Sequence, residues 1–300
     1  MKEGNNVMKI KKFLIFSVLI LLLMSGCSMT KDSMEDINIY TTTYPIRYLL
    51  DSLYGENSTI NSIYPAGVDT NDYELSDKKL EEYAKTDLFV FNSLDKDRDY
   101  AVKMININKN LKVIDVSKGI TYTDNIAELW LNPYNYLMMA QNTKDGLLEY
   151  ISNPYLISNT DGTGIEDKYE ELKYSLSRLD ADIKEDINLA HYKTIVVDSN
   201  MFKFLEKYDL NVISLEENSD LTDSTINEVK KLLNNGTIKY IYSGSNETND
   251  TCKNLIDNYG AELITLNTMN SIDGGITNSN ENYITVMNNN LDLLNKELYK

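Results

Sequence analysis

Histidine and cysteine are nearly missing from this chain of 300 residues, which holds one histidine, His191, and two cysteines, Cys27 and Cys252. Zinc sites that need two or three imidazole ligands are therefore excluded, and so is a Cys-x-x-Cys metal motif. The single histidine is poorly placed for a Ser–His or Cys–His pair, and no other motif indicates catalysis. The sequence therefore predicts a protein that is not an enzyme.

Basic residues are also few, since 29 Lys and Arg stand against 46 Asp and Glu and the formal net charge is −17. A chain of this charge disfavours nucleic acid and anionic surfaces as partners, and it concentrates cations around itself. The acidity also has a simpler explanation, which is solubility. We expect no nucleic-acid partner.

Long apolar runs are limited to residues 13–24, which are preceded by a cluster of lysines and followed by Ser25, Gly26 and Cys27. The run is about half of the roughly 20 residues that a membrane-spanning helix needs. A basic start, a short apolar stretch and small residues before a cysteine are typical of a bacterial lipoprotein signal. We therefore expect removal of residues 1–26 and lipidation of Cys27, with an ordinary secretory signal as the alternative. More than one acyl chain gives stable anchoring at the outer face of the cell membrane.

The remaining chain alternates short apolar runs with amphipathic stretches, which is typical of parallel sheets covered by helices. Residues 153–164 interrupt this pattern with one proline and two glycines. In residues 165–189, apolar side chains at every third or fourth position predict one amphipathic helix of about 25 residues. We predict two α/β lobes joined by this long rigid helix, with a ligand cleft between the lobes; a single doubly wound sheet is the alternative. The predicted division is a flexible polar tether (27–36), an N-terminal lobe (37–164), a linking helix (165–191) and a C-terminal lobe (192–300).

Several segments, in this order, resemble the metal-binding lipoproteins of ABC importers, which deliver zinc or manganese and whose two lobes are bridged by a rigid helix. The resemblance implies that the solute is held between the lobes and handed to a membrane permease. It covers nearly all of the chain after the signal. The segments are INIYTTTYPIRYLLDSLYG, SIYPAGVDTNDYELSDKKLEEYAKTDLFVFN, ELWLNPYNYLMMA, VVDSNMFKFLEKYDL and ENYITVMNNNLDLLNKEL.

The resemblance also implies four metal-ligating side chains, and each of the four positions carries a substitution here. Asn71 stands in place of the first histidine and Glu128 in place of the second. The third ligand, His or Glu in the family, falls on Asp198 or Ser199, depending on where a one-residue gap is placed. Asn267 stands in place of the final aspartate.

These side chains offer only oxygen, whereas zinc favours imidazole and thiolate. An oxygen-only set suits Mn²⁺, Ca²⁺ or Mg²⁺ better than Zn²⁺, and two neutral amides bring little charge, so we expect one weakly bound divalent cation. Re-use of the cleft for a non-metal small ligand is the alternative. We expect Tyr44, Tyr73 and Trp130 to line the cleft, where aromatic rings suit an organic molecule, although Trp130 is better explained by packing.

The sequence thus predicts a monomeric, lipid-anchored solute-binding lipoprotein on the extracellular face of the cell membrane, with an ABC permease as its partner. Two other functions stay open. One is a surface lipoprotein that keeps the scaffold for interaction or adhesion, and the other is an accessory component that regulates an importer.

Overall fold

The computed structural model of the chain describes residues 33–300 apart from 66–67, 69, 71–72, 124 and 272–280. The expected signal segment (1–26), the expected lipidation site Cys27 and the candidate ligand Asn71 lie outside the described residues. In the part of the chain that is described, no helix combines the length and the apolar character that a membrane crossing requires.

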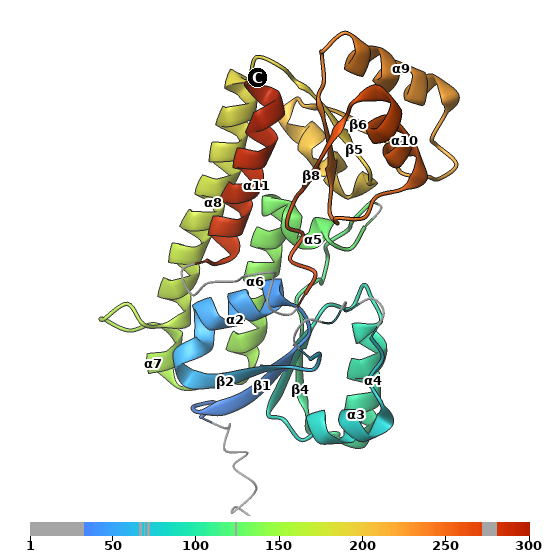
Figure 1. Ribbon diagram of the computed structural model, residues 1–300. Coiled ribbons are helices and arrows are strands. Elements are labelled where there is room, and N and C mark those ends of the chain that lie inside the picture. Colours follow the sequence, from blue (N-terminus) through green and yellow to red (C-terminus); the bar gives the residue numbers. More distant parts are fainter. Residues whose placement is uncertain (1–32, 66–67, 69, 71–72, 124, 272–280) are drawn as a thin grey trace, which may run out of the picture. The chain divides into compact units, whose positions relative to one another are not determined.

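Two four-stranded sheets organise the chain (Figure 1). The first contains β1 (Ile37–Thr41), β2 (Ser58–Ser62), β3 (Leu88–Phe91) and β4 (Lys112–Asp115), and the second contains β5 (Thr194–Val197), β6 (Asn211–Ser214), β7 (Tyr240–Ser243) and β8 (Glu262–Thr265). The strand orders are β2-β1-β3-β4 and β6-β5-β7-β8, and every neighbouring pair is parallel. The predicted fold class, two α/β lobes with parallel sheets, is confirmed.

Helices connect the strands and cover the sheets, as the alternating sequence pattern predicts. Up to residue 157 they are, in chain order, α2 (Tyr44–Tyr54), the 3₁₀ turn η1 (Gly55–Asn57), α3 (Asp77–Tyr83), α4 (Asp97–Ile107), α5 (Glu128–Leu131), α6 (Pro133–Tyr150) and α7 (Pro154–Ile157). The long helix α8 (Ile165–Leu189) follows, and then come η2 (Asn200–Tyr208), α9 (Asp223–Asn234), α10 (Asp250–Tyr259) and α11 (Tyr283–Leu298).

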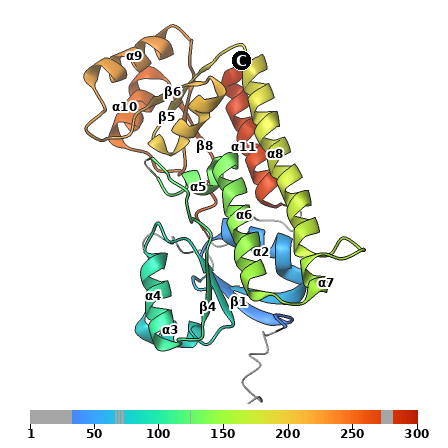
Figure 2. The same cartoon turned by 180° about the vertical axis from the view of Figure 1, so that it is seen from behind.

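Both faces of the first sheet are covered at the central strand β3, which explains why this strand is apolar throughout. Side chains alternate between the two faces of a strand. On β3, Leu88 and Val90 therefore join the core formed with α2 and α6, whereas Phe89 and Phe91 join a second core formed with α3 and α4. Figures 1 and 2 show these two pairs of helices on opposite sides of the sheet.

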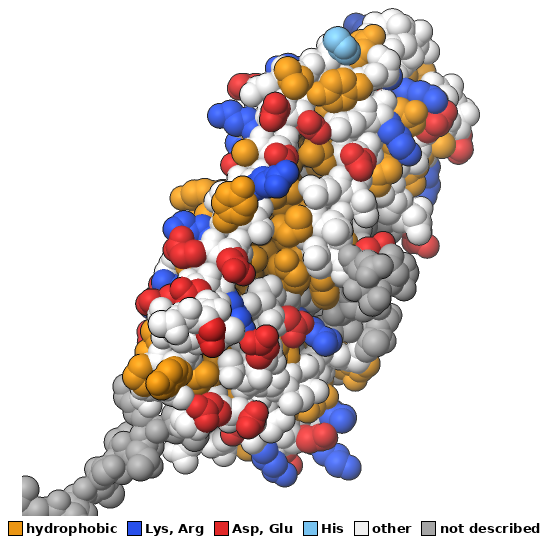
Figure 3. Space-filling view, turned by 90° about the vertical axis from the view of Figure 1, so that its left-hand side faces the viewer, with side chains coloured by type: hydrophobic (Ala, Val, Ile, Leu, Met, Phe, Trp, Pro, Cys, Tyr) orange, Lys and Arg blue, Asp and Glu red, His pale blue; other side chains and the backbone are white. Residues whose placement is uncertain are grey.

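Helix α8 is the single long helix that the apolar spacing predicts, and its buried side chains all lie on one face. Figures 1 and 2 show α8 beside α6 and α11, and it contacts both of them. Its outer face carries ion pairs, such as Lys173–Glu170 at 3.0 Å and Arg178–Asp182 at 3.6 Å. Figure 3 shows acidic and basic side chains interspersed on this side of the molecule. The buried residues of α8 are Ile165, Tyr169, Leu172, Leu176, Leu179, Ile183 and Ile187.

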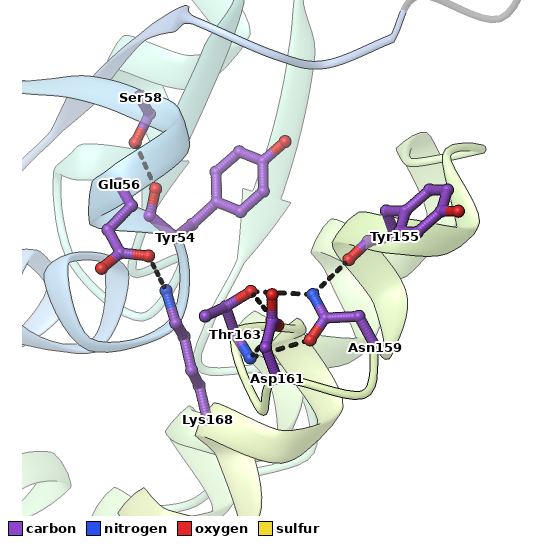
Figure 4. A network of polar contacts seen from close by, with 8 residues as sticks. All are labelled: Tyr54, Glu56, Ser58, Tyr155, Asn159, Asp161, Thr163 and Lys168. Atoms are coloured by element: carbon purple, nitrogen blue, oxygen red, sulfur yellow. Dashed lines mark hydrogen bonds and ion pairs between the residues drawn. The ribbon is translucent and has the colours of Figure 1, made fainter.

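The turn before α8 is fixed by polar contacts, which Figure 4 shows from close by. The amide of Thr163 donates to Asn159 Oδ1 at 3.0 Å, and the Thr163 hydroxyl donates to Asp161 Oδ1 at 2.8 Å. One turn into the helix, Lys168 Nζ lies 2.9 Å from Glu56 Oε2. This ion pair ties the start of α8 to η1 of the N-terminal lobe.

Met34 lies within the stretch (27–36) for which the sequence predicts a flexible tether. Met34 is fully buried in the core, and its main-chain carbonyl accepts a hydrogen bond from the Tyr54 hydroxyl. A methionine in an otherwise polar stretch can bury its side chain, and the local pattern alone does not reveal this. Met34 therefore packs against the N-terminal lobe.

Candidate functional site

A large cavity, with a volume of about 750 Å³, lies where strands β5, β7 and β8 end. In parallel α/β sheets, ligands characteristically bind beyond the carboxyl ends of the strands, because the loops there converge. Val68 and Asn125 of the N-terminal lobe also contribute to the wall. The described lining from the C-terminal lobe consists of Asp198, Ser199, Met201, Ser243, Gly244, Ser245, Asn246 and residues 265–271.

Asp198 follows β5 directly and provides a carboxylate in this wall. Its amide donates to the carbonyl of Tyr242 at 2.9 Å, and its Oδ2 accepts from the Thr248 hydroxyl at 3.1 Å. Burial raises the pKa of the Asp198 carboxyl, while the hydroxyls of Ser243 and Thr248 partly offset this effect. A bound cation would favour the ionised form of this carboxyl.

Ser199 also lines the cavity, but its hydroxyl already has partners. The hydroxyl accepts from the amide of Met201 at 3.3 Å, which caps η2, and donates to Glu216 Oε2 at 3.1 Å. Glu216 Oε2 also accepts from the amide of Asn200 at 2.6 Å. Sequence reasoning missed Glu216, although it stands just after β6, beside β5, where a parallel sheet brings the loops together.

Asn267 lies in the wall formed by the loop after β8, and its position is fixed from two sides. Its side-chain Oδ1 accepts from the amide of Met269 at 2.8 Å. Its main chain exchanges two hydrogen bonds with the side chain of Asn290 on α11, at 2.9 and 2.8 Å. The loop is therefore held by the terminal helix.

Glu128 is placed differently from the other candidates. It is the first residue of α5, is 6% exposed, and is not among the described residues that line the large cavity. Its Oε2 accepts from the amide of Thr123 at 3.2 Å and its Oε1 from the amide of Asn125 at 3.3 Å. The carboxylate thus holds the loop before α5, and Asn125 from that loop reaches the cavity wall.

The structure therefore brings together Asp198, Ser199 and Asn267 among the predicted ligands, while Asn71 is outside the described residues. Within the described ranges, no three His, Cys, Asp or Glu side chains gather in a group that could hold a metal. The described donors of the wall are hydroxyl, amide, carboxylate and main-chain oxygens together with two thioethers. Such a set suits hard cations or a polar organic molecule.

The three aromatic residues expected to line the cleft lie among packed rings instead of in the described lining of the large cavity. Tyr44 is half-buried with its ring 6.4 Å from that of Tyr48, and Tyr73 meets Tyr64 edge-on at 6.1 Å. Trp130 is 3% exposed, in agreement with the packing explanation. Large rings gain more free energy from burial in a core than from a place in a wet cavity wall.

Trp130 nevertheless affects the cavity indirectly. Its indole Nε1 donates to the carbonyl of Thr268 at 2.7 Å, and its own carbonyl accepts from the Tyr283 hydroxyl at 2.5 Å. Thr268 belongs to the loop that lines the cavity. Helix α5 of the N-terminal lobe is therefore bonded to the wall that the C-terminal lobe provides.

Comparison with known proteins places this arrangement in a family. The family described as zinc-uptake complex component A, periplasmic (ZnuA), matches residues 39–297. The zinc-binding lipoprotein AdcA of Streptococcus pneumoniae is 23% identical over 309 positions, which cover 94% of this chain but 60% of AdcA. The chain thus spans less than two thirds of the length of that relative.

Two further relatives have lengths closer to this chain. A metal ABC transporter substrate-binding lipoprotein of Lactococcus lactis is 25% identical over 92% of this chain and 93% of its own. The crystal structure of the metal-dependent lipoprotein YcdH of Bacillus subtilis superposes with a TM-score of 0.69 at 20% identity, covering 88% of this chain and all of YcdH. The family match extends over most of the chain. The chain therefore belongs to the family of periplasmic component A of zinc-uptake complexes, whose members are substrate-binding proteins of ABC transporters and not enzymes.

Proposed function

We propose that this chain captures a solute outside the cytoplasm, in the large cavity beyond strands β5, β7 and β8, and delivers it to the permease of an ABC importer. The observation that carries the proposal is the cavity itself, with Asp198 in its wall at the site where parallel sheets bind ligands. Membership of a family of substrate-binding proteins supports it. So does the name of the Lactococcus lactis relative.

As the solute we propose a divalent cation that is bound weakly, with Mn²⁺, Ca²⁺ or Mg²⁺ preferred over Zn²⁺. AdcA is named for zinc, but the candidate ligands of this chain are Asn71, Glu128, Asp198 or Ser199, and Asn267, which offer oxygen only. Glu128 already accepts two main-chain hydrogen bonds, so coordination by it would have to compete with them. Oxygen ligands with little net charge give low affinity and disfavour zinc.

We further propose that residues 1–26 form a signal that is removed, that Cys27 carries lipid, and that the protein works as a monomer on the extracellular face of the membrane. The lobes (37–164 and 192–300) would then be joined through the linking helix (165–191). The motif before Cys27 and the lipoprotein names of the relatives support this proposal.

The test is metal analysis of the full chain, purified in detergent without chelator, together with thermal unfolding in the presence of Mn²⁺, Ca²⁺, Mg²⁺ or Zn²⁺. We expect up to one metal ion in the large cavity of each chain and a rise in Tm with a hard cation, and we expect Asp198→Asn to lose the part of that rise that comes from this cavity. Asp220→Asn removes the same charge at an exposed position and should change nothing. Tight stoichiometric zinc would contradict the metal preference.

Transport itself needs a cellular measurement. Deletion of the gene should reduce uptake of the bound metal under metal limitation, and the wild-type chain should restore uptake where Asp198→Asn does not. A metal-free chain that responds to none of the four ions, with unchanged uptake, would argue against transport of a metal. It would favour a small organic ligand in the cavity or a role of the scaffold in surface adhesion.

A further inference from the structure

A second, much smaller cavity lies beside Trp130. Its volume of about 10 Å³ leaves room for a single particle the size of a water molecule. Among the described lining residues Ile126 and Trp130 are apolar, and Tyr64 also borders the cavity. The other described lining side chains all carry oxygen: Thr43, Thr70, Asn92, Asp95, Asp97 and Asn270.

Asp97 is the main charge of this cavity. It begins α4, is 4% exposed, and accepts a hydrogen bond from the Tyr64 hydroxyl at 2.7 Å. Burial raises the pKa of its carboxyl to about 6, even though the bond from Tyr64 lowers it. The positive charge of Lys96, whose Nζ lies 5.8 Å from the centre of the Tyr64 ring, also lowers this pKa, but it does not offset the effect of burial. A cation bound in the cavity would stabilise the ionised form of this buried carboxyl.

Thr43 gives a second and independent indication of a ligand. It stands at the N-cap position of α2, is 8% exposed, and its hydroxyl makes no hydrogen bond within the described part of the chain, not even the usual one to the helix. Pro45 follows at the second helical position and offers no N–H for a cap. The hydroxyl is therefore a buried oxygen that borders the cavity without a partner.

Asn270 adds a similar oxygen from the C-terminal lobe. Its side-chain Oδ1 is buried and has no hydrogen-bond partner in the described part of the chain. Its main-chain carbonyl accepts from the Thr70 hydroxyl at 3.3 Å, which fixes the loop against the cavity. Buried polar atoms are nearly always bonded in folded proteins, so two such oxygens around one small void point to a bound particle.

We propose that this small cavity binds one Ca²⁺ ion, with Asp97 as the principal anionic ligand and with Thr43 and Asn270 as neutral oxygen ligands. The donors come from a turn, a helix start and a loop, and Ca²⁺ accepts such irregular oxygen sets. Mg²⁺ usually keeps several waters, for which the cavity has no room. Zn²⁺ finds no nitrogen or sulfur donor among the described lining residues. The proposed site shares only Asn270 with the described lining of the large cavity, and the proposal does not depend on the proposed transport function.

The experiment titrates the full chain in detergent with CaCl₂ and with MgCl₂, and it follows calorimetric heat and Tm. We expect CaCl₂ to raise the Tm of the wild type at millimolar concentration or below, with MgCl₂ much less effective. Asp97→Asn should weaken Ca²⁺ binding at least tenfold, and Thr43→Val, which keeps the shape of the side chain, should weaken it several-fold.

Two control variants locate the ion. Asp99→Asn removes the same charge from an exposed position of the same helix and should bind Ca²⁺ like the wild type. Asp198→Asn alters the large cavity and should lose only binding that belongs to that cavity, so the Ca²⁺ binding that Asp97→Asn removes should persist in it. If Asp97→Asn fails to fold, Thr43→Val decides alone, since it removes one oxygen without changing charge.

Three results would overturn the proposal. The first is the absence of heat and Tm shift with 10 mM CaCl₂, which would leave the cavity to a water molecule. The second is Ca²⁺ binding that survives both Asp97→Asn and Thr43→Val. The third is binding lost in Asp198→Asn but kept in Asp97→Asn, which would assign the ion to the large cavity and support the proposed function instead.

Discussion

Replacement of Trp130 by phenylalanine tests whether the N-terminal lobe holds the wall of the large cavity in place. In the wild type the indole N–H donates to the carbonyl of Thr268, and the bond is buried between residues 138 positions apart. Phenylalanine keeps an aromatic ring in the core but has no donor. The carbonyl of Thr268 would then stay buried without this partner.

The expected loss of stability has two parts. Loss of one partner of a buried hydrogen bond costs about 1–3 kcal/mol. The smaller ring removes roughly 40 Å² of buried apolar surface, or about 1 kcal/mol at about 25 cal/mol per Å². The free energy of unfolding of Trp130→Phe should therefore fall by about 2–4 kcal/mol.

The specific readout is amide hydrogen exchange in residues 266–271, combined with urea unfolding. Tyr136→Phe is the matched control, because the Tyr136 hydroxyl donates a buried bond of 2.7 Å to the carbonyl of Pro45 within the N-terminal lobe. Both variants should lose stability, but only Trp130→Phe should speed exchange in residues 266–271 under native conditions. Equal exchange of this loop in the two variants would refute the view that Trp130 fixes the cavity wall.

Two further predictions concern charges in the C-terminal half of the chain. Glu297 is 0% exposed, and its Oε2 accepts from the amides of Lys239 and Tyr240 at 2.8 and 2.9 Å. Glu297→Ala should therefore lower the free energy of unfolding by about 3–5 kcal/mol, and Glu297→Gln, which keeps one oxygen, by about 1–2 kcal/mol. Equal losses in urea unfolding at pH 7 would contradict this. Burial by itself would raise the pKa of Asp180, but hydrogen bonds from Tyr208 and Lys207 outweigh burial and lower this pKa. The stabilising effect of the ionised Asp180 is therefore present above the unfolded-state pKa near 4, and it is lost as the pH falls through the folded-state pKa. Asp180→Asn should therefore cost about 1 kcal/mol at pH 7 and less at pH 3, and a penalty independent of pH would disprove the assignment.

The fold was largely predictable because its signals are local. The apolar spacing in residues 165–189 needed one face of a helix to be buried, and α8 occupies the same residues. The short apolar runs form the strands of two parallel sheets, because their apolar side chains also need to be buried. Helix α4 is hard to predict from the sequence, although Tyr100, Ala101 and Met104 have helical spacing and are buried on one side. The charged residues Asp97, Arg98 and Asp99 at the start of α4 obscure this pattern.

The site was predictable only in part, because its residues meet through the tertiary structure. The family resemblance led to Asp198, Ser199 and Asn267, which do share one wall. It could not show that Glu128 bonds to the amides of its own loop, since this depends on how the loop before α5 turns back. Nor does the sequence around Asp97, rich in charged residues, reveal that this side chain is buried.

The sequence by itself determined the class of fold, the long helix and the oxygen-rich character of the candidate ligands, because these properties follow from residue type and periodicity. Only the tertiary structure decided which of those oxygens face a cavity and which are already bonded to main-chain amides. It also decided that Trp130 joins the two lobes and that Thr43, Asp97 and Asn270 surround one small void. These features depend on contacts between segments up to about 200 positions apart, for example Thr70 and Asn270, and no local pattern encodes such contacts.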